Sequence, residues 1–196
     1  MIRPHAYILA GGRSSRFGSD KAFAQLDAKP LVVHTCERLE SLTQSVSVVA
    51  EYPNKFEQLG LRTIADHTPH LGPLGGMLAA MDDRPHDEPT HDGPILISAC
   101  DLLVPTQAIE QLLTSWQADD RALARSDGPR WHPFPGLYHS SLSSAIRELI
   151  EGPDRSVRAL LERFARGIEN PPVAGAVDCN TPRDLIRAAS GRGTEK

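Results

Sequence analysis

Apolar residues along the chain fall into two alternating patterns: short continuous runs, and runs with helical spacing. The continuous runs are rich in β-branched residues and predict buried strands. They lie at 6–10, 45–50, 61–65, 94–99, 121–125 and 173–178. Apolar residues three and four positions apart predict helices instead. These lie at 30–42, 53–59, 73–82, 105–116, 140–150, 156–164 and 181–189.

The alternation of strands and helices predicts an α/β fold. We expect a single three-layer domain with an open, mostly parallel sheet and helices on both faces. That domain should span residues 1–190, followed by a disordered tail at 191–196. Such sheets bind ligands in the crevice at the carboxyl ends of their strands, so residues that follow a strand are the first candidates for a site.

Composition narrows the class of protein. The 196 residues are 40% hydrophobic and 23% charged, as expected for a globular domain. The formal net charge of −4 argues against a general nucleic-acid binder, so a basic site must be local. The three cysteines are far apart in the sequence, at Cys36, Cys100 and Cys179. This spacing contains no zinc-binding motif and is typical of a protein from a reducing compartment. The sequence has no signal peptide and no apolar run of membrane length, so we expect a cytoplasmic protein.

The segment after the first predicted strand is the most informative. Residues 7–21 read Tyr-Ile-Leu-Ala-Gly-Gly-Arg-Ser-Ser-Arg-Phe-Gly-Ser-Asp-Lys. Glycines let a ligand approach the backbone, and consecutive free N–H groups bind anions. Arg13, Arg16 and Lys21 add the charge that a polyphosphate needs. The spacing is neither that of a P-loop nor that of a dinucleotide fingerprint. The alternative is a surface turn with solvated basic residues.

This segment resembles the start of the nucleotidyltransferase family that contains the molybdenum-cofactor guanylyltransferases. Its members open with Leu-Ala-Gly-Gly, then Arg-Met/Phe-Gly, then Asp-Lys. The matching residues here are Leu9-Ala10-Gly11-Gly12, Arg16-Phe17-Gly18 and Asp20-Lys21. The resemblance implies a Rossmann-like nucleotidyltransferase fold of the GT-A type, with the nucleotide in the N-terminal half and the acceptor in the C-terminal half. It assigns nucleotide binding to Leu9, Ala10, Gly11, Gly12 and Lys21, and catalysis to Arg16 and Lys21.

Asp101 follows the strand predicted at 94–99 and is the first candidate for a metal ligand. Mg²⁺ prefers one or two carboxylates together with phosphate and water oxygens. The alternative is a cap for the next helix, although Pro105 comes four residues later. The family's Cys-Asp motif matches Cys100-Asp101. The resemblance therefore implies that Asp101 is catalytic and binds both magnesium and the nucleotide.

A second motif follows the strand predicted at 61–65. Asp66 stands there, and from composition alone it is equally well a turn residue before Pro69. The family has an Asp that contacts the nucleotide at this point, followed by Gly-Pro-Leu-x-Gly at the start of a helix. Residues 72–76 read Gly-Pro-Leu-Gly-Gly. The resemblance implies nucleotide binding by Asp66 and by Gly75, near a helix N-terminus where N–H groups are free.

The acceptor residues are expected in the C-terminal half. Arg155 resembles the family's Gly-x-Arg segment, which is associated with the pterin substrate, and is otherwise a solvated cation at a helix start. Asn180, in Asn-Thr-Pro, matches an acceptor-binding motif and is otherwise a helix cap. Many members have Asn two residues before this motif, where this chain has Asp178. The segment from His132 to Tyr138 resembles a family strand beside the acceptor site.

The resemblance implies transfer of GMP from GTP to the phosphate of molybdopterin, or of its molybdenum form, with Mg²⁺ as the cofactor. Guanylyl members carry a base-recognising Asn after the second strand, where this chain has Glu51, with Asn54 a few residues later. Transfer from CTP, or to a sugar phosphate, therefore stays open, as does a non-catalytic nucleotide-binding module. We expect neither nucleic-acid nor membrane partners, and leave open transient contact with other cofactor-biosynthesis proteins.

Overall fold

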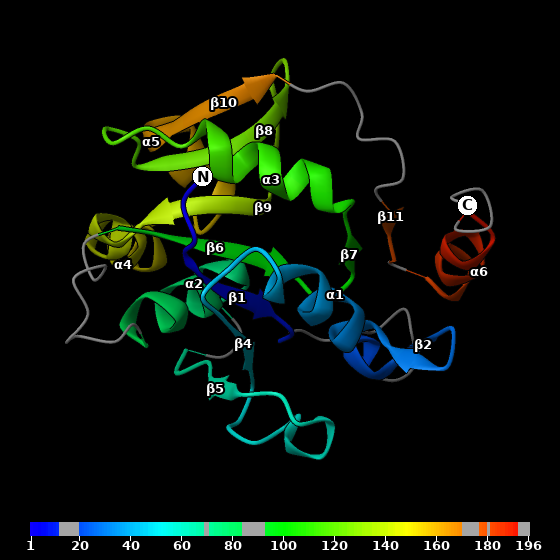
Figure 1. Cartoon of the computed structure of the whole chain (residues 1–196). Helices are drawn as coiled ribbons and strands as arrows, with labels where there is room; N and C mark the ends of the chain where they lie inside the picture. The colour runs from blue at the N-terminus through cyan, green and yellow to red at the C-terminus, as the bar shows by residue number, and fades with distance from the viewer. Residues whose placement is uncertain (12–19, 69–70, 84–92, 170–176, 180, 192–196) are drawn as a thin grey trace.

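A computed structural model describes residues 1–11, 20–68, 71–83, 93–169, 177–179 and 181–191. In these residues a seven-stranded sheet has the order β10-β8-β9-β6-β1-β4-β5 (Figure 1). Its strands are β1 (His5–Leu9), β4 (Ser45–Ala50), β5 (Thr63–Ala65), β6 (Pro94–Ala99), β8 (Ala122–Asp127), β9 (Arg130–His139) and β10 (Ala165–Glu169). Only β9 runs antiparallel to its neighbours in this sheet. The mostly parallel α/β sheet is therefore confirmed.

Helices cover both faces of the sheet, because successive strand residues point to opposite sides. Ala6 and Ile8 of β1 join a core that includes residues of α1 and α3, whereas Tyr7 joins a core with residues of α2, α4 and α5. Figure 1 shows α1 and α3 on the near side of the sheet. The helices are α1 (Leu31–Glu40), α2 (Pro73–Asp82), α3 (Thr106–Ser115), α4 (Ser143–Glu151), α5 (Val157–Phe164) and α6 (Pro182–Gly191). In the part of the chain that the structure describes, no helix has the length and apolar character needed to cross a membrane.

Three expectations need correction. The helix predicted at 53–59 is only a 3-10 turn, η2 (Glu57–Leu59), because Asn54 has a φ of 65° and interrupts helical geometry. The edge strand β10 was not expected, since its sequence, Ala-Arg-Gly-Ile-Glu, lacks a continuous apolar run. Gly191 belongs to α6 rather than to a tail. The start of the strand predicted at 173–178 lies outside the described residues.

The C-terminal segment returns to the N-terminal half of the chain. There β11 (Val177–Asp178) pairs antiparallel with β7 (Leu102–Leu103), and α6 contacts β2 (Gln25–Leu26), which pairs with β3 (Lys29–Pro30). Figure 1 places β11 and α6 beside β7, on the side toward which β6 points. A separate small core holds this arrangement together. Its buried residues are Leu26, Leu31, Leu103, Cys179 and Ala188.

Candidate active site

The carboxyl ends of β1 and β6 bring Lys21 and Asp101 into contact. The two strands pair as far as Leu9 and Ala99, and the Cys100 amide donates to the Leu9 carbonyl at 3.1 Å. Beyond that point the Nζ of Lys21, at the start of η1 (Lys21–Phe23), donates to Oδ2 of Asp101. The two side chains are 18% and 20% exposed, so solvent reaches both. The structure thus joins two residues that the sequence motifs singled out separately.

Asp101 does not cap a helix. The next helix, α3, begins at Thr106 with Pro105 at its N-cap, so the capping alternative fails. The Asp101 carbonyl oxygen instead accepts from the Cys179 amide at 2.8 Å. The neighbouring Cys100 thiol is buried, and this burial, together with the charge of Asp101, raises its pKa. Cys100 therefore stays protonated and is not a nucleophile.

Leu9, Ala10 and Gly11 line the start of the loop after β1. Ala10 is buried, and its amide donates to the Val49 carbonyl at 2.8 Å, which ties this point to β4. Among the residues that the structure describes, a Cβ added to Gly11 would meet no atom within 4 Å. Gly11 therefore leaves open space beside the backbone. The two other predicted residues of this loop, Gly12 and Arg16, lie outside the described residues.

Asp66 and Gly75 lie in contact at the end of β5. Oδ1 of Asp66 accepts from the amide and hydroxyl of Thr68, at 2.9 and 3.2 Å, so the carboxylate also organises the turn. A Cβ at Gly75 would lie 2.7 Å from the Thr68 hydroxyl, 2.8 Å from its carbonyl oxygen and 3.1 Å from the Asp66 carboxylate. A Cβ at Gly76 would approach the Leu9 side chain at 3.0 Å. The glycines thus let α2 pack closely against both the turn and β1.

One participant at this edge was not identified from the sequence. Lys55 is buried in the turn after β4, and its Nζ contacts Asp20 at 2.6 Å and Glu51 at 2.5 Å. Oδ1 of Asp20 in turn caps η1 by accepting from the Ala22 amide at 3.0 Å. The available sequence signal was an acidic and a basic residue four positions apart, directly after a buried strand.

The predicted acceptor residues are not brought together. Arg155 is exposed in the connection between α4 and α5, and its Nε donates to the Gly152 carbonyl at 3.4 Å. Asn180 lies outside the described residues. The helix-capping role falls to Thr181, whose amide and hydroxyl both donate to Asp184 at 2.8 Å, and whose hydroxyl accepts from the Asp184 amide at 3.3 Å.

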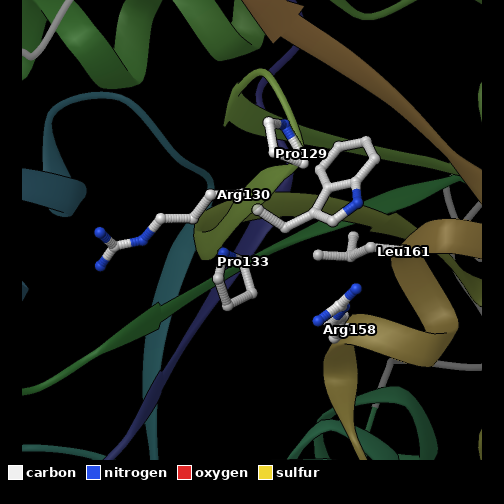
Figure 2. Close-up of a pocket in the computed structure, with 6 residues that line it drawn as sticks. Pro129, Arg130, Pro133, Arg158 and Leu161 are labelled. Carbon is white, nitrogen blue, oxygen red and sulfur yellow. The ribbon is translucent and has the colours of Figure 1, made fainter.

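A pocket of about 490 Å³ opens between the start of β9 and α5 (Figure 2). Because Ile97 of β6 pairs with Gly136, the first residues of β9 extend to and beyond the carboxyl end of β6. The pocket therefore lies toward the same edge of the sheet as Asp101. Figure 2 shows Arg158 and Leu161 on α5 across from Pro133. The lining residues are Pro129, Arg130, Trp131, Pro133, Arg158 and Leu161.

The donor set fits a cation that takes most of its ligands from elsewhere. Across the described ranges, no group of three or more His, Cys, Asp or Glu side chains is arranged to hold a metal ion. Asp101 offers one partly exposed carboxylate at the edge of the crevice. Mg²⁺ binds in this way, through one or two carboxylates plus substrate phosphates and water. Asp101 therefore fits magnesium that arrives with a nucleoside triphosphate.

Two solved structures illustrate the likeness of the fold. Molybdopterin-guanine dinucleotide biosynthesis protein A from Archaeoglobus fulgidus matches with a TM-score of 0.77 and 22% identity, covering 96% of this chain and 98% of that one. A CMP:2-keto-3-deoxy-manno-octonic acid synthetase complexed with CTP matches with a TM-score of 0.74 and 16% identity, over the full length of both chains. At these identities the likeness shows the fold alone.

Sequence comparison goes further than the fold. A molybdenum cofactor guanylyltransferase from Shewanella halifaxensis is 32% identical, covering 78% of this chain and 76% of the relative. One from Shewanella sp. strain MR-4 is 31% identical, covering 94% of both. The family model for the MobA-like NTP transferase domain matches residues 6–168. The resemblance inferred from the motifs is confirmed: the chain belongs to the MobA-like NTP transferase family and is a nucleotidyltransferase.

Proposed function

We propose that the protein transfers GMP from GTP to the phosphate of molybdopterin or its molybdenum form, releasing pyrophosphate and leaving a guanine dinucleotide cofactor. The observation that carries this proposal is the contact between Lys21 and Asp101 at the carboxyl ends of β1 and β6. A cation and a partly exposed carboxylate meet there beside an open glycine backbone, as a metal-bound polyphosphate requires. The relatives named as molybdenum cofactor guanylyltransferases support the choice of donor and acceptor.

In this proposal the protein positions two anions and offsets their charge. Backbone groups from Leu9 to Gly12 hold the polyphosphate, while Arg16 and Lys21 stabilise the charge that develops during transfer. Asp101 would hold Mg²⁺, which supplies positive charge to the phosphate oxygens when bound. The acceptor phosphate is already an anion, so positioning contributes more than proton removal. Asp66 and Gly75 complete the nucleotide side.

The acceptor side of the proposal centres on the pocket between β9 and α5. Trp131 offers an aromatic face and Arg158 a guanidinium, a combination that suits a planar ligand carrying negative charge. Arg155 lies in the connection just before α5 and is assigned to the acceptor from the Gly-x-Arg resemblance. Asn180 is assigned to the acceptor from its Asn-Thr-Pro motif alone.

The proposal is tested first on the donor. Calorimetric titration with GTP, CTP, ATP and UTP, each with and without Mg²⁺, should show magnesium-dependent preference for GTP, weakened in Asp101→Asn. Pyrophosphate release should then require molybdopterin. A preference for CTP would show that CTP, rather than GTP, is the nucleotide donor, and the proposed reaction would still be nucleotidyl transfer. Magnesium-dependent nucleotide binding without pyrophosphate release on adding molybdopterin would contradict the acceptor.

A further inference from the structure

Lys55 is a buried lysine with two carboxylate partners. Its side chain is 5% exposed, and its Nζ lies 2.6 Å from Oδ2 of Asp20 and 2.5 Å from Oε2 of Glu51. Glu51 precedes it in the turn after β4, whereas Asp20 belongs to the segment that leads from β1 into η1. Lys55 therefore links two segments that are far apart in the sequence and that border the reacting groups.

The burial of Lys55 requires this pairing. An unpaired ammonium in the protein interior strongly destabilises the folded state, so buried lysines are retained only with charged partners. Burial by itself lowers the pKa of Lys55, but the hydrogen bonds to Asp20 and Glu51 outweigh it, and the pKa is raised overall. Lys55 is thus a fixed positive charge at neutral pH.

Aromatic packing holds the same two segments together. The Nζ of Lys55 lies 5.4 Å from the ring centre of Phe56, which is fully buried. Phe56 packs against Phe23 of η1, with ring centres 5.0 Å apart. The position of Lys55 relative to η1 is therefore set by packing as well as by charge.

Asp20 directly precedes Lys21, whose partner is Asp101. The Asp20 carboxylate caps η1, the turn that begins with Lys21, through the Ala22 amide, and its other oxygen contacts Lys55. In the structure Lys55 contacts Asp20 and Lys21 contacts Asp101. Without Lys55, the negative charge of Asp20 would compete for Lys21 and repel an incoming polyphosphate.

We infer that Lys55 is a positioning residue for nucleotidyl transfer, which holds and neutralises Asp20 so that Lys21 stays directed at Asp101 and the phosphates. The inference rests on the roles proposed for Lys21 and Asp101, and is independent of which nucleotide or acceptor the protein uses. It makes the turn after β4 a support for the phosphate end of the site.

The first test measures lysine reactivity and needs no substrate. Lysines occur at positions 21, 29, 55 and 196, so amine acetylation followed by mass spectrometry reports on each one separately. In Lys55→Met the charge of Asp20 is no longer neutralised and holds Lys21 more firmly as an ammonium, so we expect Lys21 to acetylate about tenfold more slowly, within the range that couplings between neighbouring residues give. Lys29 serves as the internal reference, and Lys55→Arg should restore the wild-type rate. An unchanged rate at Lys21 in Lys55→Met would overturn the inference.

The second test separates this role from simple stabilisation of the fold. If Lys55 acts by neutralising Asp20, then adding Asp20→Asn to Lys55→Met should recover most of the lost magnesium-dependent nucleotide affinity and most of the lost Lys21 acetylation rate. Asn retains the ability to cap η1. A purely structural lysine predicts the reverse, with the double variant no better than the single one, and that result would also overturn the inference.

Two further variants keep the test decisive. Lys29→Met removes an exposed lysine from its pair with Glu37, at 2.7 Å, and should change neither Lys21 reactivity nor nucleotide affinity. If Lys55→Met does not fold, Lys55→Gln removes the charge and keeps a hydrogen-bonding group beside Asp20 and Glu51, and should lower the acetylation rate of Lys21 by a smaller factor. No fall in folded Lys55→Gln would then count against the inference. Failure of the proposed function would appear instead as the wrong nucleotide or acceptor, with these reactivity changes intact.

Discussion

The proposed nucleotide side and the proposed acceptor side of the crevice differ in how their charges are held. On the nucleotide side, Lys21 is paired with Asp101, and Lys55 is buried between Asp20 and Glu51. On the acceptor side, the Arg158 side chain is 73% exposed. Among the ion pairs of the described residues, its one partner is Glu162, which lies one helical turn away. Surface pairs of this kind contribute little to stability and exchange partners readily. The first region is organised before a ligand arrives, whereas the second has cations available for one.

The largest expected effect is at Asp101. Asp101→Asn removes the charge that pairs with Lys21 and would hold Mg²⁺, so kcat/KM should fall by about 10²- to 10³-fold, as when a single charge-stabilising group is lost. The matched control is Asp82→Asn, which breaks a surface pair with Arg147 at 2.9 Å and should leave kcat/KM nearly unchanged. Equal turnover in wild type and Asp101→Asn would show that the preorganised side is not the catalytic one.

Gly75 tests how tightly the nucleotide side is built. Gly75→Ala places a methyl group 2.8 Å from a backbone carbonyl, which must move, and we expect a loss of about 1–3 kcal/mol in the free energy of unfolding, with weaker nucleotide binding. Gly76→Ala meets only a flexible Leu9 methyl group at 3.0 Å and should be tolerated better. Chemical denaturation and nucleotide titration of both variants measure the difference. Equal effects would mean that α2 adjusts as a whole.

Arg158 tests the acceptor side. Arg158→Ala should raise the KM for the anionic acceptor about fivefold, the loss of roughly one hydrogen bond, while nucleotide affinity stays the same. Arg163→Ala is the matched control, because Arg163 lies on the same helix and is not among the pocket-lining residues. Initial-rate kinetics with either substrate varied will separate the two effects. A change in nucleotide affinity alone would place the acceptor elsewhere.

The smallest expected effect is a pH dependence at the junction of the two sides. Burial raises the pKa of the Cys179 thiol from 9.0 to about 11. The native state therefore retains a proton that the unfolded chain releases, and this contribution to stability is complete below pH 9 and declines as the pH rises toward 11. Chemical denaturation should therefore show a larger fall in unfolding free energy for wild type than for Cys179→Ala between roughly pH 8.5 and 10.5. This range covers most of the interval between the unfolded and folded pKa values of the thiol. Parallel curves would contradict the assignment to Cys179.

Local motifs made much of the molecule predictable. The strands at 45–50 and 94–99 and the helix at 73–82 have the expected bounds, because β-branched runs, Gly72 and Pro73 specify them within a few residues. Lys21 and Asp101 were each assigned to the crevice, since parallel strands place the residues that follow them at one edge, but their contact was not predicted. Each of these inferences needed only one segment and a general rule of sheet geometry.

Features assembled from distant segments could not be predicted. The burial of Lys55 depends on its contact with Asp20, which is distant in the sequence, so the sequence alone does not predict it. The pocket needs the β8–β9 hairpin and α5 together, and the family resemblance pointed only to the β9 segment from His132 to Tyr138. The strand β10 forms by pairing with β8, and its own residues do not predict a strand. Its Gly167 packs closely against β8, because a Cβ there would lie 2.7 Å from the Ser126 hydroxyl.

The hydrogen bond from the Cys179 amide to the Asp101 carbonyl bears on synthesis of the chain. Ribosomes release a protein from its N-terminus onward at roughly 5–20 residues per second. The segments that carry Lys21 and Asp101 emerge early, but the segment that secures the Asp101 backbone emerges near the end. A nascent chain would thus expose the edge with Lys21 and Asp101 for several seconds, by that rate, before its last segment attaches. A product terminated after β10 would retain the sheet and lack this final attachment.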